Sequence, residues 1–178
     1  PIKNYLKVAN SEIVKAKKEL RVFNRKFKIG LSWKSFNNLY SNQKSLDLID
    51  FDFLIKSNEI DVLNLQYGDV SKEINNYNNN SISKINVLDN LDLLNDFIKI
   101  ASILKNLDLF ISTSNSTAHL AGALGVKTLL IKPFNQATFH YWNQPNNRTP
   151  WYNSIELIEK SEIYNNELFE EKVFSILN

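Results

Sequence analysis

The chain has 178 residues and a formal net charge of +2, from 21 Lys and Arg against 19 Asp and Glu. This length suits one domain that buries a hydrophobic core. Hydrophobic residues make up 43% of the chain and charged residues 22%, which argues against wholesale disorder. The balanced charge gives no signal for nucleic acid, and the absence of Cys excludes disulfides and thiolate sites. With only His119 and His140 available, we predict no metal ion and no other cofactor.

The sequence also lacks the signals of membrane insertion and export. No apolar run approaches the ~18 residues of a membrane-spanning helix, and no signal peptide opens the chain. We therefore predict a cytoplasmic protein without a membrane span. The chain begins at Pro1 and contains no Met, so we expect a fragment of a longer protein.

Apolar periodicity and turn residues divide the chain into alternating strands and helices. The first helix is predicted to begin with Ser11 as its N-cap. Loops are expected over 34–45, 75–83 and 133–153. The predicted strands cover 27–33, 61–67, 85–88, 107–112, 126–131 and 154–158, and the predicted helices cover 11–23, 51–56, 70–77, 96–104, 117–124 and 165–177.

The alternation of elements predicts an α/β fold. The strands at 107–111 and 126–131 are nearly continuous apolar runs, which is typical of parallel strands covered on both faces. We predict a Rossmann-like, doubly wound parallel sheet, with no internal repeat. In such sheets ligands bind beyond the carboxyl ends of the strands.

The strongest candidate site is the hydroxyl-rich turn that follows the strand at 107–112. Asn115, Ser116, Thr117 and His119 lie where a helix begins, and a helix N-terminus presents free N–H groups and partial positive charge to a phosphate. Ser, Thr and Asn are equally ordinary capping residues, and a single histidine is often structural. Both interpretations remain open from the residues alone.

Three further strand ends carry polar or aromatic residues. Lys44 follows the first strand and is either a phosphate contact or a solvated loop lysine. Gln66 and Tyr67 end the second strand, where they either meet a base or ribose or, for Tyr67, serve as a half-buried packing residue. The loop 133–153 holds six aromatic residues, which either floor a nucleotide or sugar pocket or form a small satellite core.

Taken in order, these segments resemble the C-terminal half of glycosyltransferase family nine. That family contains the ADP-heptose lipopolysaccharide heptosyltransferases and bacterial transferases fused to tetratricopeptide repeats. The stretch 5–7 and the helix after it also resemble the link that precedes this domain in the repeat-fused members. The resemblance rests on Lys28–Trp33, Lys44–Leu46, Leu65–Asp69, Leu107–Ser112, Asn115–Gly125 and Pro150–Tyr152.

The resemblance implies the C-terminal half of a GT-B fold, with residues 1–26 as a linker and 27–178 as the donor-binding domain. It implies a metal-independent, inverting enzyme that transfers a hexosyl or heptosyl group from a nucleotide-sugar to a glycan, lipid or protein acceptor. Lys44, Asn115, Ser116, Thr117 and His119 match positions that hold the donor diphosphate. Gln66 and Tyr67 fall near the nucleoside pocket. The general base would lie in a missing N-terminal domain, so the isolated domain is expected to be inactive.

One residue departs from the family pattern. Many members carry an Asp directly before this turn, where the present chain has Ser114. The departure supports a competing function, that of a non-catalytic Rossmann-like binding or scaffold module in a repeat protein. An epimerase of the same architecture is a third, weaker alternative, because it needs carboxylates and a second cleft wall that this chain does not supply.

Overall fold

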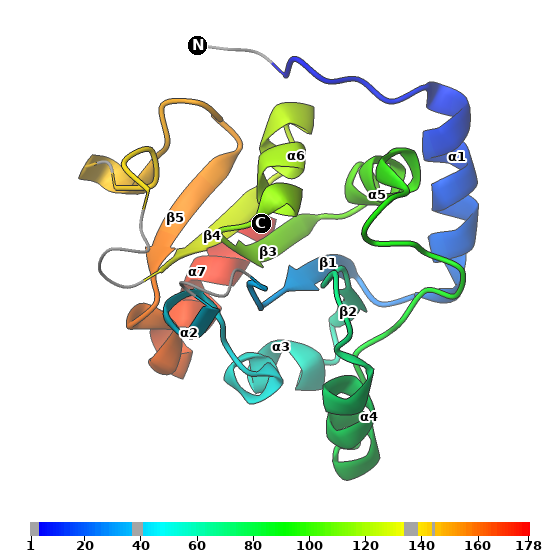
Figure 1. The fold of residues 1–178 in the computed structure, drawn as a ribbon. Coiled ribbons are helices and arrows are strands. Elements are labelled where there is room, and N and C mark those ends of the chain that lie inside the picture. The colour runs from blue at the N-terminus through cyan, green and yellow to red at the C-terminus, as the bar shows by residue number, and fades with distance from the viewer. Residues whose placement is uncertain (1–3, 37–40, 134–138, 144) are drawn as a thin grey trace.

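The computed structural model describes residues 4–36, 41–133, 139–143 and 145–178, and it is built on one five-stranded parallel sheet (Figure 1). The strand order is β2-β1-β3-β4-β5, and every neighbouring pair is parallel. This result confirms the predicted doubly wound α/β fold. The strands are β1 (Phe27–Ser32), β2 (Ile60–Asn64), β3 (Leu109–Thr113), β4 (Thr128–Lys132) and β5 (Ile155–Glu159).

Helices cover both faces of the sheet, which explains why consecutive strand residues are buried on both sides. All five residues of β3 and of β4 are buried. One face carries α1 (Asn10–Glu19), α5 (Phe97–Leu104) and α6 (Ser116–Leu124), and the other carries α3 (Asp52–Lys56), α4 (Ser71–Asn80) and α7 (Asn166–Leu177) (Figure 1). A short helix, α2 (Ser41–Lys44), and 3₁₀ turns at Leu20–Val22, Leu48–Phe51, Pro145–Asn147 and Glu162–Tyr164 complete the described elements.

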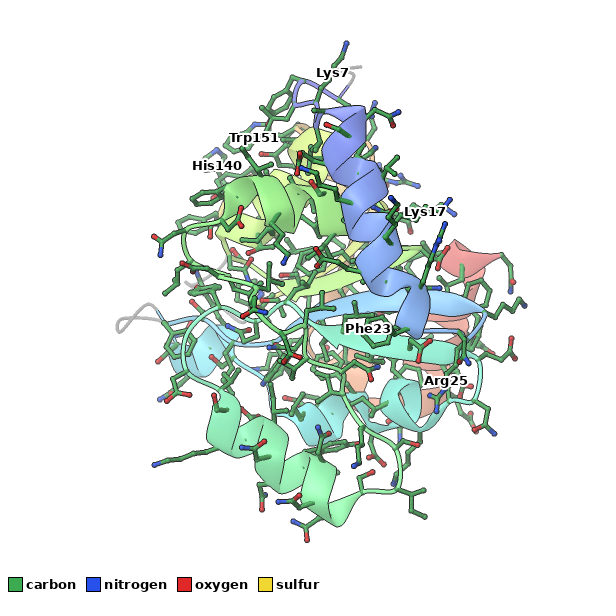
Figure 2. All side chains as sticks on the ribbon, turned by 90° about the vertical axis from the view of Figure 1, so that its right-hand side faces the viewer. Lys7, Lys17, Phe23, Arg25, His140 and Trp151 are labelled. Atoms are coloured by element: carbon green, nitrogen blue, oxygen red, sulfur yellow. The ribbon has the colours of Figure 1, made fainter. Side chains whose placement is uncertain are left out.

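The N-terminal segment packs along the helices of one face. Leu6 donates its backbone N–H to the Ala123 carbonyl at 3.1 Å, and the Asn106 side chain donates to the Ile13 carbonyl at 3.0 Å. Figure 2 views the molecule along this side, with α1 running from near Lys7 down to Phe23 and Arg25. The division into a linker over 1–26 and a domain over 27–178 stays a prediction.

Several predicted elements differ from the structure. The segment 85–88 forms one parallel bridge, between Leu63 and Asn86, and is not a strand of the sheet. The helix predicted over 70–77 continues to Asn80, into a stretch expected as loop, because Ile74 and Tyr77 pack against the core. Ser11 is not the N-cap, since the first helix begins at Asn10 after Ala9. The predicted loop over 34–45 contains α2.

No helix in the described ranges is long and apolar enough to cross a membrane.

Candidate functional site

The candidate site lies where the strand order reverses, at the carboxyl ends of β1 and β3. The chain passes from β1 outward to β2 and then returns across β1 to β3. The connections that follow β1 and β3 lead toward opposite edges of the sheet, and doubly wound folds bind ligands beside such a reversal. The turn from Ser114 to His119 follows β3 directly and leads into α6.

Three buried polar side chains join the ends of the three strands at this point. Asn115 Nδ2 donates to Ser32 Oγ at 2.9 Å, and Ser32 Oγ donates to Gln66 Oε1 at 3.1 Å. Gln66 Oε1 also accepts the Lys34 backbone N–H at 2.6 Å. This network fixes the turn before α6 relative to the loop that leaves β1.

Asn115 is also the N-cap of α6, since its Oδ1 accepts the Ala118 backbone N–H at 3.0 Å. The cap satisfies one of the free N–H groups of the first turn and leaves others for a ligand. Ser116 is exposed, whereas Thr117 is buried. Capping and a phosphate-facing helix end are therefore compatible in this geometry.

The first turn of α6 carries no carboxylate to offset the positive end of its dipole. Among the described helices of eight residues or more, each of the others has one, either at the N-cap or in the first turn. These carboxylates belong to Glu12 of α1, Glu73 of α4, Asp96 of α5 and Glu167 of α7. The N-terminus of α6 is thus the one among them whose partial positive charge is not offset by a carboxylate at its N-cap or in its first turn.

Lys44 adds a full positive charge to this edge of the sheet, beside the partial charge of the α6 N-terminus. It lies in α2 instead of in a solvated loop. Only 4% of Lys44 is exposed, and its Nζ lies 4.7 Å from the ring centroid of Phe139. No carboxylate of the described residues forms an ion pair with it, and burial lowers the pKa of its amine. By contrast, Lys34 is neutralised by Glu73 at 2.7 Å.

A row of aromatic rings connects Lys44 with α6. Phe139 stacks on Tyr141 with ring centroids 5.3 Å apart, and Tyr141 stacks on Trp151 at 4.3 Å. The Tyr141 ring also meets the His119 ring edge-on at 5.6 Å. Lys44 and His119, 75 positions apart in the sequence, therefore lie on one aromatic cluster.

Part of the aromatic loop after β4 forms the satellite core that was one of the two predicted roles, and part of it stays exposed. Trp142 and Tyr152 are buried in a small satellite core against α6 and β5. Phe139 and Trp151 remain 46% and 42% exposed. Figure 2 shows His140 and Trp151 together on the flank of the molecule, far from Arg25.

His119 lies half-buried in the first turn of α6 and bonds within the protein. Its Nδ1 lies 3.0 Å from the Tyr152 hydroxyl, and no described residue hydrogen-bonds its Nε2. Burial lowers the pKa of the imidazole, which favours the neutral ring. One ring nitrogen is thus engaged and the other remains available.

Ser114, the residue that departs from the family pattern, holds the aromatic loop in place. Its Oγ accepts the indole N–H of Trp142 at 3.1 Å, and both side chains are buried. At the end of β3 the Thr113 hydroxyl is buried without a hydrogen-bond partner in the described part of the chain.

Gln66 and Tyr67 have separate surroundings. Gln66 lines a groove of about 530 Å³ together with Asn64, Ile74 and Leu91. Its amide is largely engaged within the protein, since Nε2 donates to the Tyr67 carbonyl at 2.8 Å. The Tyr67 ring instead packs against Phe36, with centroids 5.6 Å apart.

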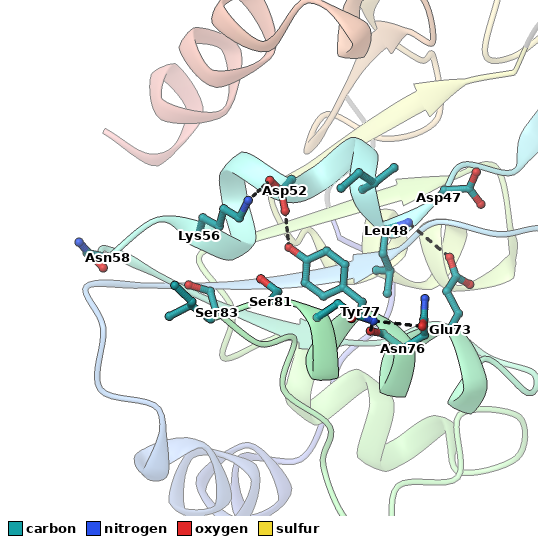
Figure 3. Close-up of a pocket in the computed structure, with 13 residues that line it drawn as sticks. Asp47, Leu48, Asp52, Lys56, Asn58, Glu73, Asn76, Tyr77, Ser81 and Ser83 are labelled. Carbon is teal, nitrogen blue, oxygen red and sulfur yellow. Dashed lines mark hydrogen bonds and ion pairs between the residues drawn. The ribbon is translucent and has the colours of Figure 1, made fainter.

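A larger groove, of about 870 Å³, lies elsewhere, between α3 and α4 (Figure 3). Several of its polar side chains pair with one another or with the protein backbone. The Tyr77 hydroxyl donates to Asp52 at 2.6 Å, Lys56 pairs with the same carboxylate at 2.6 Å, and Glu73 accepts the Leu48 N–H at 3.3 Å. Size alone therefore does not identify the site.

The sequence analysis missed four buried polar residues, of which Ser32, Lys132 and Lys160 lie at strand ends and Tyr152 lies in the loop before β5. Ser32 and Tyr152 bond directly to the predicted site residues. Lys132 is buried and pairs with Glu159, and Lys160 is buried and donates to the Ser45 carbonyl at 2.6 Å. The available signal was a polar residue at the end of an apolar strand, as for Ser32 and Lys132, or directly after the strand, as for Lys160. No group of three His, Asp or Glu that could hold a metal occurs within the described ranges.

Comparison with known proteins gives a likeness of fold to a solved structure. No family model matches the chain, and no curated protein matches it. The fold matches the crystal structure of the glycosyl transferase family 9 from Veillonella parvula DSM 2008, with a TM-score of 0.63 and 11% sequence identity. The match covers 94% of this chain and 46% of that one, so the chain spans about half the length of its structural neighbour.

Proposed function

We propose that this chain is the nucleotide-sugar donor-binding domain of a glycosyltransferase. The observation that carries the proposal is the N-terminus of α6, which has no carboxylate of its own and lies on the same aromatic cluster as the buried Lys44. The site occupies the reversal point of the sheet, where nucleotides bind in doubly wound folds. The likeness to a glycosyl transferase family 9 structure supports the fold that this function needs.

In this proposal the turn and Lys44 stabilise the leaving group. The bond between the anomeric carbon and the diphosphate oxygen breaks, and the nucleoside diphosphate leaves with additional negative charge. The free N–H groups at Ser116 and Thr117, the Lys44 ammonium and His119 would stabilise that charge. A hydroxyl of the acceptor attacks the anomeric carbon, and a general base outside this chain takes its proton.

The finer properties follow the family resemblance. We propose an inverting, metal-independent transfer of a hexosyl or heptosyl group, in a cytoplasmic protein whose N-terminal half binds a glycan, lipid or protein acceptor. The groove beside Gln66 is the proposed nucleoside pocket, with Val87 and Leu91 as apolar walls for the base. Tyr67 does not line that groove, so its proposed part is at the rim, next to Gln66.

A second candidate function rests on Ser114. Its neutral hydroxyl accepts a hydrogen bond from Trp142, whereas many members of the family that the sequence resembles carry a carboxylate at this position. A domain built in this way could bind a nucleotide or another anion without catalysing transfer. The second candidate is therefore a non-catalytic Rossmann-like module of a repeat protein.

Calorimetric titration with ADP, UDP and GDP tests the donor site. We expect one of them to bind, and the variants Lys44→Met and His119→Ala to bind it more weakly. No binding of any nucleoside diphosphate would contradict both the donor site and its nucleotide-binding alternative. Binding without consumption of any nucleotide-sugar by the longer protein that we propose would favour the non-catalytic module.

A further inference from the structure

The His119 ring is enclosed by aromatic side chains from two segments of the chain. The ring centroids of Tyr141, Trp142, Trp151 and Tyr152 lie at 5.6, 5.1, 6.1 and 5.8 Å from that of His119. Three of these neighbours contact it only through their rings. Tyr152 is different, because its hydroxyl lies 3.0 Å from His119 Nδ1.

Tyr152 is held in this place by close packing against α6. Only 6% of Tyr152 is exposed. A Cβ atom at Gly122 would lie 2.5 Å from Tyr152 Cγ, so the glycine is what allows the ring to approach the helix. The contact between Tyr152 and His119 is therefore built into the packing of α6.

Tyr5, from the segment before α1, completes the arrangement. Its ring stacks on the Tyr152 ring, with centroids 6.2 Å apart and planes inclined by 27°. Burial, followed by a hydrogen bond with Tyr5, raises the pKa of the Tyr152 hydroxyl. Tyr152 thus keeps its proton at all ordinary pH values, and this one hydrogen goes either to His119 Nδ1 or to the Tyr5 oxygen.

A neutral imidazole carries its hydrogen on one nitrogen, and the partner of the other nitrogen decides which. If Tyr152 donates to Nδ1, the hydrogen of His119 is on Nε2. If Nδ1–H donates to the Tyr152 oxygen, Nε2 becomes an acceptor and would repel a phosphate oxygen. Only the first arrangement makes His119 a donor to an anion.

We infer that Tyr152 is a positioning residue that donates to Nδ1 of His119 and thereby holds the imidazole neutral, with its hydrogen on Nε2 and available to the donor diphosphate. The role toward the diphosphate rests on the proposed function, whereas the tautomer does not. The hydrogen bond from Nε2 of neutral His119 to the diphosphate would strengthen as negative charge develops on the leaving group. Because Tyr5 stacks on Tyr152, the position of the N-terminal segment would influence the hydrogen bond between Tyr152 and His119.

The groups around His119 support a neutral ring. Its titratable neighbours are Tyr141 and Tyr152, with Tyr5 behind Tyr152 and His140 next to Tyr141. No described carboxylate pairs with His119, and burial lowers the pKa of the imidazole. Nothing described in this enclosure would hold a proton on both nitrogens.

The ¹⁵N resonances of the imidazole test the tautomer without any ligand. The chain has two histidines, so His140→Gln leaves His119 as the one imidazole signal. We expect the Nε2–H tautomer in this background and a shift toward a mixture of tautomers in Tyr152→Phe. Tyr141→Phe is the matched control, since that ring contacts His119 without a hydrogen bond, and it should leave the tautomer unchanged.

An Nδ1–H tautomer in the parent background would overturn the inference, as would an unchanged tautomer in Tyr152→Phe. The parent measurement stands even where a variant fails to fold. A second measurement tests the role toward phosphate, by titration with the best-binding nucleoside diphosphate. Loss of one neutral hydrogen bond predicts about 3- to 10-fold weaker binding in Tyr152→Phe at pH 8.

At pH 5.5 the affinity of Tyr152→Phe should recover, because His119 without its donor can accept a proton and bind the anion as a cation. A purely structural role for Tyr152 would give the same loss at both pH values and would contradict the positioning role. Equal affinity of Tyr152→Phe and the parent chain at pH 8 would also contradict it. If no nucleoside diphosphate binds while the tautomer is Nε2–H, the proposed function fails and the assignment of the tautomer stands.

Discussion

The N-termini of α6 and α7 are built from the same local chemistry and differ in everything around it. Each begins with an Asn whose side chain accepts the N–H three residues on, at 3.0 Å from Asn115 and 3.3 Å from Asn165. At α7 the cap is exposed and Glu167 offsets the dipole. At α6 the cap is buried, bonded to the sheet and without a carboxylate. A helix cap becomes a candidate anion site only through its surroundings.

The largest expected effect is on stability, when the N-cap of α6 and the N-cap of α7 are each replaced by Ala. Asn115→Ala removes a cap and leaves Ser32 and the Ala118 N–H without their buried partner, so we expect the free energy of unfolding to fall by about 3 kcal/mol. Asn165→Ala should cost about 1 kcal/mol, the usual value for an exposed cap. Urea denaturation of both variants measures the difference. Equal losses would mean that the buried network adds nothing to the α6 cap.

The next effect concerns the lysine beside α6. Lys44→Met removes a buried cation, and we expect nucleoside diphosphate affinity to fall about 10- to 100-fold, as for a charge-assisted hydrogen bond. Lys84→Met is the control, because Lys84 is an exposed lysine away from the strand ends. Calorimetry should show unchanged affinity in the control. A similar loss in both variants would point to general charge attraction in place of a site.

A carboxylate added to each helix sharpens the comparison. Ser116→Asp places a negative charge at the first residue of α6, and Asn166→Asp does so in α7. Both should stabilise their helix by about 0.3–1 kcal/mol. Only Ser116→Asp should weaken nucleoside diphosphate binding, by about 10-fold. Thermal denaturation and calorimetry on the same samples should therefore move in opposite directions for α6, and unchanged binding in Ser116→Asp would reject the α6 site.

The smallest effect is the pH dependence of stability. Burial lowers the pKa of His119 in the folded chain, so between that value and about 6.5 the unfolded chain binds more protons than the folded one. Stability is therefore complete above about pH 6.5 and declines as the pH falls through the folded pKa. The decline should be smaller in His119→Gln than in the parent chain. Urea midpoints from pH 5 to 8 provide the measurement, and identical pH profiles would contradict the expected burial effect.

Much of the fold could be predicted because periodic apolar residues report directly on burial. The strands at β1, β3 and β4 and the helices α5 and α7 follow from that signal. The segment 85–88 has the composition of a strand, yet it joins the sheet through a single bridge. Composition cannot show how many partners an edge segment finds.

The site was predictable in part. Its central turn lies at a strand-to-helix junction, and general rules locate ligands there. The bonds from Asn115 to Ser32 and from His119 to Tyr152 join residues 83 and 33 positions apart, and no local pattern encodes such pairs. The aromatic loop was ambiguous because burial and exposure alternate among rings of similar chemistry.

The strand order has a consequence for how the chain is synthesised. Strand β1 pairs with β2 and with β3, and the Lys28 N–H meets the Asp108 carboxylate 80 residues later. At a translation rate of about 5–20 residues per second, β1 waits roughly 4–16 s for its second neighbour. During that interval the N–H and C=O groups along one edge of β1 are unpaired and open to other chains. The chain is therefore prone to pair with other chains until β3 has been made and has closed this edge.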